Sequence, residues 1–141
     1  MSQNSLFDRL CAAGAEVRRG KLGSVLSVNF ACKSEASHPP VTESTEEEPG
    51  WLQDLGECVK CRELYLTGQP LGDTALEFLI QRMPALQVLD LDQTHVTESI
   101  LGQVESLEKL KILSLSGTCV PEDRIREARK RLIQTRIIKL H

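Results

Sequence analysis

The chain has 141 residues, of which 40% are hydrophobic and 26% are charged, a composition typical of one globular domain and not of a disordered chain. The formal net charge of −3 gives the chain no general attraction to nucleic acid. The five cysteines are odd in number and irregularly spaced, which argues against a disulfide framework and predicts a reducing, cytoplasmic location. No stretch reaches the roughly 18 apolar residues of a membrane-spanning helix.

Residues 1–33 are predicted to form an N-terminal cap helix and a degenerate first strand. Four apolar residues recur at helical spacing after Ser5, a suitable N-cap: Leu6, Phe7, Leu10 and Cys11. This pattern, without a basic start or a long apolar run, favours an amphipathic helix over a signal peptide. The first strand is expected in VLSVNFACK, which begins at Val25.

Residues 34–50 are predicted to form an acidic inserted loop. The segment contains Pro39, Pro40, Pro49 and the run 46–48 of glutamates. It explains why 36 residues separate Val28 from Leu64, 12 more than the later step from Leu89 to Leu113. Such an insertion costs little entropy, so a tolerated surface loop is the simpler interpretation. The alternative is an acidic arm that contacts a partner.

Residues 51–141 contain an internal repeat. Three segments align without gaps: CRELYLTGQPL from Cys61, LQVLDLDQTHV from Leu86, and LKILSLSGTCV from Leu110. A further copy, TRIIKLH, is predicted to begin at Thr135. The fourth and sixth positions of each copy are expected to share the core face of a strand. Amphipathic helices are expected within 72–83, 96–107 and 121–133, with Asp73, Thr97 and Glu122 at N-caps or in first turns.

This pattern resembles the leucine-rich repeat. The endings Gln93–Thr94 and Gly117–Thr118 are similar to the short bacterial type, in which threonine replaces the usual asparagine. The resemblance covers residues 14–33 weakly and 51–141 well. It implies an α/β, right-handed solenoid with a parallel sheet on the concave face and helices on the convex face. It also implies a binding surface, although a fold alone does not identify a ligand.

The third, fifth and seventh positions of each copy are expected to point away from the core, toward a partner. Nine residues make up this predicted binding face: Glu63, Tyr65, Thr67, Val88, Asp90, Asp92, Ile112, Ser114 and Ser116. Weaker copies extend the same rows to Ser27, Asn29, Ala31, Ile137 and Lys139. An apolar lane beside the single tyrosine is typical of protein contacts, so we expect a non-enzymatic protein-binding module. The terminal strand could also pair with a second copy to form a homodimer.

The C-terminal segment suggests a different ligand. In residues 121–141, basic residues outnumber acidic ones by seven to three. Five of them lie on the predicted last helix: Arg124, Arg126, Arg129, Lys130 and Arg131. A solvated outer face is the simpler interpretation. The alternative is an anionic partner, RNA or an acidic protein, although the segment has no aromatic residue to stack on bases.

Cys58 and Cys61 have the spacing of half a zinc site or of a redox pair. The repeat alignment instead gives them core positions, where the other copies have Met83 and Leu107, then Leu86 and Leu110. A second Cys-x-x-Cys is absent, and the histidines His38, His95 and His141 lie far away in sequence. We therefore predict no metal and no cofactor. A nucleophile–base pairing and a glycine-rich phosphate loop are also lacking, which argues against an enzyme.

Overall fold

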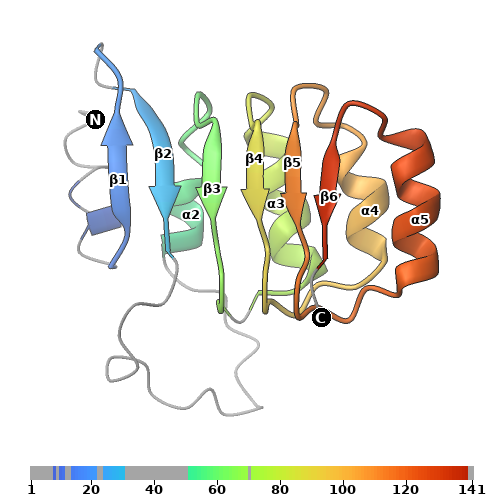
Figure 1. The fold of residues 1–141 in the computed structure, drawn as a ribbon. Coiled ribbons are helices and arrows are strands. Elements are labelled where there is room, and N and C mark those ends of the chain that lie inside the picture. The colour runs from blue at the N-terminus through green and yellow to red at the C-terminus, as the bar shows by residue number, and fades with distance from the viewer. Residues whose placement is uncertain are drawn as a thin grey trace.

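The computed structural model describes residues 8, 10, 11, 14–21, 24–30, 51–69 and 71–139 (Figure 1). The fold is mixed α/β, with one six-stranded sheet whose strands follow sequence order. The strands are β1 (Glu16–Arg19), β2 (Val25–Asn29), β3 (Glu63–Tyr65), β4 (Val88–Asp90), β5 (Ile112–Ser114) and β6 (Arg136–Ile138). The helices are α2 (Trp51–Leu55), α3 (Asp73–Arg82), α4 (Ser99–Val104) and α5 (Glu122–Arg131).

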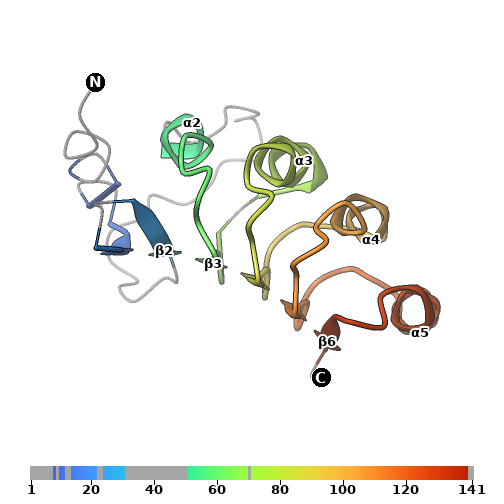
Figure 2. The same ribbon diagram turned by 90° about the horizontal axis from the view of Figure 1, so that it is seen from above.

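The helices α2 to α5 all lie on one side of the sheet, and the row of units curves with the strands on its inner side (Figure 2). We call the side of the sheet opposite these helices the open face. Within the described residues, no helix combines the length and the apolar character that a membrane span requires.

The predicted strand register is confirmed from β2 to β5. Val28 pairs with Leu64, Leu64 with Leu89, and Leu89 with Leu113, all in parallel. These four side chains are fully buried and form the core with the apolar residues of the helices. Because side chains alternate along a strand, the residues on either side of each core position lie on the open face.

The helices bury the apolar stripes that the sequence predicts. Leu76 and Leu79 of α3, Ile100 of α4, and Ile125 and Ala128 of α5 are all buried. The three faces that pack on the sheet are therefore the ones with apolar residues at helical spacing.

The prediction for the helix starts is only partly right. Asp73 and Glu122 lie in first turns, but Thr97 precedes the N-cap Glu98 by one residue. Asp73 binds the next unit, because its carboxylate accepts hydrogen bonds from the Thr97 amide at 2.9 Å and the Thr97 hydroxyl at 2.6 Å.

The turns after β3, β4 and β5 each use a residue in the left-handed conformation. Gly68 and Gly117 have φ of 78° and 74°, and between them Gln93 adopts φ of 57° at the equivalent position. This conformation is easy for glycine and costs energy for glutamine. The chain accepts it because Thr94, the next residue, is buried and its hydroxyl donates to the Leu91 carbonyl at 2.7 Å.

The register predicted for the last strand is wrong by one residue. Ile137 pairs with Leu113 and is only 4% exposed, whereas the sequence alignment placed it on the open face. The last step is thus 24 residues and not 25. Lys139 was also predicted on the open face, but it comes directly after β6 and its side chain lies on the core side of the sheet. Its ammonium donates to the Thr118 carbonyl at 3.4 Å and to the Val120 carbonyl, which satisfies a charge at the end of the core.

The first strand of the sheet was not predicted. β1 runs antiparallel to β2 and covers the edge where the parallel series begins. Just before it, Leu10 is fully buried as expected, but Cys11 is exposed and does not belong to the apolar stripe. The predicted residues Ser5, Leu6 and Phe7, the loop 34–50 and Ala31 lie outside the described residues.

Candidate functional site

The open face consists of rows of side chains that cross all the strands. Pairing across the sheet places partner residues on the same face. One row contains Arg18, Ser27, Glu63, Val88, Ile112 and Arg136. The next contains Glu16, Asn29, Tyr65, Asp90, Ser114 and Ile138. In these two rows, β4, β5 and β6 each contribute one aliphatic and one polar or charged residue, whereas β1 and β2 contribute only polar or charged ones.

An apolar strip formed by Val88, Ile112 and Ile138 lies on adjacent strands. Val88 and Ile138 are half-buried, and Ile112 is 37% exposed. The strip that we predicted ended at Ile137. The register of β6 instead places Arg136 opposite Ile112, in that row, and Ile138 opposite Ser114, in the row of Tyr65. Arg136, which pairs with Ile112, is an exposed cation beside the strip that the sequence alignment did not identify. A 24-residue step for the last unit, equal to the step from Leu89 to Leu113, would have predicted Arg136 and Ile138 on the open face.

Tyr65 is held in place next to this strip. Its hydroxyl donates to Glu63 Oε1 at 2.9 Å, from the neighbouring row of the same strand. Burial, this hydrogen bond and the carboxylates of Glu63 and Asp90 raise the pKa of Tyr65, whereas Arg18 lowers it. The side chain therefore presents a neutral, oriented ring on the open face.

A carboxylate network fixes the polar part of the face. Asp92 Oδ1 accepts from the Ser114 hydroxyl at 2.5 Å and from the Ser116 amide at 2.8 Å. The Asp92 amide in turn donates to Asp90 Oδ1 at 3.0 Å. The Asp92 carboxylate thereby links the chain just after β4 to β5 and to the residue that follows it.

The remaining predicted residues take different positions. Thr67 and Ser116 are half-buried where the strands lead into the turns. Ser27, predicted on the face, is only 8% exposed. It pairs on one side with Arg18 and on the other with Glu63, so longer side chains flank its short one. The Ser27 position therefore offers little surface to a partner, although Glu16 and Arg18 in the same two rows are exposed.

The basic helix α5 is partly neutralised by its neighbours. Arg124 pairs with Glu98 at 2.8 Å and with Glu127 at 3.5 Å, and Arg131 pairs with Glu105 at 3.2 Å. A third arginine, Arg129, donates to the Ile137 carbonyl at 3.0 Å. Arg126 and Lys130 are exposed. These contacts within the chain leave α5 a weaker anion site than its composition suggests, although such exposed pairs contribute little stability.

The two cysteines of the Cys-x-x-Cys motif are part of the core. Cys58 is 3% exposed and Cys61 is fully buried, and neither is in a disulfide. The Cys58 thiol donates weakly to the Asp54 carbonyl at 3.8 Å, and the Cys61 thiol donates to the Glu63 carbonyl at 3.2 Å. Burial above all raises the pKa of both thiols to about 12. Such thiols stay protonated near neutral pH, which makes them poor nucleophiles and poor metal ligands.

Among the described residues, no three or more histidine, cysteine, aspartate or glutamate side chains cluster in a way that could hold a metal ion.

Comparison with protein-family models gave no match, and comparison with curated proteins gave no significant match.

Proposed function

We propose that this chain is a non-enzymatic protein-binding module whose open face contacts a partner protein. The observation that best supports the proposal is the apolar strip of Val88, Ile112 and Ile138, bordered by an oriented tyrosine and two aspartates. Protein interfaces combine an apolar centre with aromatic anchors and a polar rim. The open face offers all three on one rigid sheet.

We further propose that the fold is a short leucine-rich-repeat solenoid of right-handed sense. The support is the regular spacing of Leu64, Leu89 and Leu113, with one helix between successive strands. Parallel strand–helix–strand connections are almost always right-handed. Stacked units of this kind bury a continuous core and usually bind through the inner surface of the curve.

The hydrogen bonds on the open face support a binding role over a plain solvated surface. Glu63 restrains the Tyr65 ring, and Asp92 is restrained by Ser114 and Ser116. Side chains that are already ordered lose little entropy when a partner docks, so more of the contact energy appears as affinity. The carboxylates favour a partner that presents an apolar patch next to cations or hydrogen-bond donors.

The two other predicted binding modes have less support. The ion pairs of Arg124 and Arg131 weaken α5 as a site for RNA or an acidic protein. Homodimer formation through β6 competes with Arg129, which occupies the Ile137 carbonyl on the outer side of that strand. A cytoplasmic location stays a prediction, and it is compatible with the free thiols of Cys58 and Cys61.

The test compares matched isoleucine variants. Ile112→Arg places a charge in the apolar strip, and Ile133→Arg places the same charge at a site that is 82% exposed, in the connection between α5 and β6. Both variants should keep the far-ultraviolet circular dichroism of the native chain. In affinity capture from native extracts, the proposal expects one set of proteins to be retained by the native chain and by Ile133→Arg but lost with Ile112→Arg. Tyr65→Ala should weaken the same set. Equal capture by all variants would count against the open face.

A further inference from the structure

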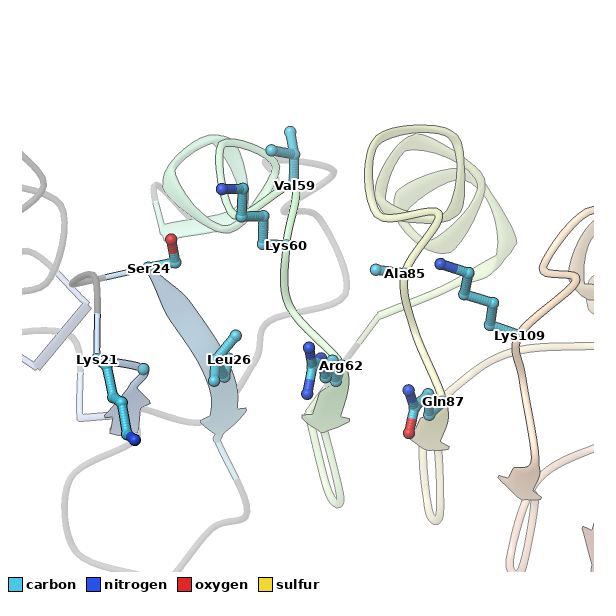
Figure 3. Close-up of a pocket in the computed structure, with 10 residues that line it drawn as sticks. Lys21, Ser24, Leu26, Val59, Lys60, Arg62, Ala85, Gln87 and Lys109 are labelled. Carbon is cyan, nitrogen blue, oxygen red and sulfur yellow. The ribbon is translucent and has the colours of Figure 1, made fainter.

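A hollow of ≈ 620 Å³ lies where the strands β2, β3 and β4 begin (Figure 3). We call it the cationic hollow. Its cations are Lys60, Arg62 and Lys109, and its apolar residues are Leu26, Val59 and Ala85. Lys21 also lines it but points away from the other cations. The volume lies within the range of small-molecule sites.

The repeat explains why a hollow forms at this place. Lys60, Ala85 and Lys109 occupy the same position in three successive units, immediately before the buried residue that opens each strand segment. The middle unit has a methyl group where its neighbours have long side chains. In Figure 3, Lys109 points toward Ala85, and Arg62 lies between the starts of β2 and β3. Lys60 points toward Ser24, so the small side chain of Ala85 leaves room for a ligand between Arg62 and Lys109.

The charge around the hollow has one sign. None of its described lining residues is acidic. Within the described part of the chain, Lys60, Arg62 and Lys109 make no ion pair, unlike Arg124 and Arg131 on α5. This concentration of positive charge stands out in a chain whose net charge is −3. Cations gathered around a concave surface raise the local concentration of anions.

The backbone beneath the hollow is rigid. The Arg62 amide donates to the Leu26 carbonyl at 2.8 Å, and the Arg62 carbonyl accepts from the amides of Gln87 at 2.7 Å and Val88 at 3.0 Å. Lys60 lies in a tight turn that the Cys61 amide closes by donating to the Cys58 carbonyl at 3.0 Å. The cations therefore project from a fixed frame, and only their side chains need ordering when an anion binds.

We propose that the cationic hollow binds a small, multiply charged organic anion, with phosphate or carboxylate groups attached to an apolar body. The Arg62 guanidinium can hold a phosphate or a carboxylate by two parallel hydrogen bonds. Lys109 supplies further charge beside Ala85, and Lys60 supplies it on the side of Ser24. The exposed Val59 side chain, together with Leu26, gives the apolar part a surface. This site is separate from the open face and does not depend on the proposed protein partner.

The experiment titrates the purified chain at low salt with four probes: ATP, adenosine, pyrophosphate and citrate. Isothermal titration calorimetry measures affinity, and amide chemical shifts locate the contact. We expect saturable binding of ATP, weaker binding of pyrophosphate and no binding of adenosine, because the charged groups dominate. Binding of citrate as tight as that of ATP would assign the site to polycarboxylates, and weaker citrate binding would assign it to phosphate esters; either result agrees with the proposal.

Matched variants separate the hollow from general charge. Arg62→Gln and Lys109→Gln each remove one cation from the hollow, and Arg126→Gln and Lys130→Gln remove the same charges from α5. The proposal expects the hollow variants to weaken ATP binding by about 10-fold and the α5 variants by less than about 2-fold. The proposal is overturned if no probe binds, or if all four variants weaken binding equally. Shift changes confined to α5 would overturn it as well.

Discussion

The adjacent residues Ile137 and Ile138 provide a direct test of the register of β6. The structure buries Ile137 against the core at 4% exposure and leaves Ile138 half-buried on the open face. The sequence alignment predicts the reverse orientation. Both residues are isoleucines and they are neighbours in the chain, so their alanine variants differ only in which face of the strand loses a side chain.

The expected costs follow from burial. Isoleucine to alanine removes three carbons, each worth about 0.8 kcal/mol when fully buried. Ile137→Ala is therefore expected to lower the free energy of unfolding by about 2.5 kcal/mol. Since β6 is the last strand in the sheet order, the space left behind can collapse or fill with water, and no large cavity penalty is added. Ile138→Ala removes half-exposed carbons and is expected to cost about 1 kcal/mol.

Urea unfolding followed by circular dichroism measures both values. With a slope of about 2 kcal/mol per molar urea, the midpoint should fall by about 1.2 M for Ile137→Ala and by about 0.5 M for Ile138→Ala. Amide hydrogen exchange should show whether only the terminal unit opens, because stability in such stacked units is partly local. An equal cost for the two variants, or a greater cost for Ile138→Ala, would refute the register and return Ile137 to the open face.

Three further outcomes are expected. Gln93→Gly should raise the free energy of unfolding by about 0.5 kcal/mol, and with it the urea midpoint, because φ of 57° is strained for glutamine. A lower midpoint would contradict this. Burial raises the pKa of Cys58 and Cys61 to about 12 from an ordinary value of 9.0, so the unfolded thiols ionise first and stability falls as pH rises above 9.0. The free energy of unfolding should be lower at pH 10 than at pH 8 by up to about 2.5 kcal/mol. The same fall in a Cys58→Ala and Cys61→Ala double variant would show that the two thiols do not cause it. Absorbance titration of Tyr65, the only tyrosine, should give a pKa above 10.0, and Glu63→Gln should lower it; an unchanged value would remove Glu63 as a cause.

The repeat itself was readable from the sequence because its period is set by local spacing. Leu64, Leu89 and Leu113 recur at a regular step, each with a second leucine two residues later. One extended segment and one amphipathic helix per unit can bury these leucines only by stacking. The same alignment assigned Cys58 and Cys61 to core positions, where the structure buries them. The register of the repeat thus placed both cysteines correctly in the core.

The register of β6 required the tertiary structure. Ile137 and Ile138 both fit an apolar core position, so hydrophobic pattern alone does not distinguish steps of 24 and 25 residues. Pairing with β5 decides between them, since Leu113 must meet a buried partner across the sheet. The same choice turns Lys139 toward the carbonyls of Thr118 and Val120.

The open face and the cationic hollow also differ in how far the sequence alone predicts them. The open-face residues Tyr65 and Asp90 followed from alternation along a strand, which is a property of the local chain. The hydrogen bond from Ser114 to Asp92 and the cationic hollow around Ala85 depend on which units become neighbours. Sequence by itself determined which residues repeat and which face each of them takes within a regular unit. Only the packing of one unit on the next decided which side chains meet, because contacts between units are set by strand register and by the size of neighbouring side chains.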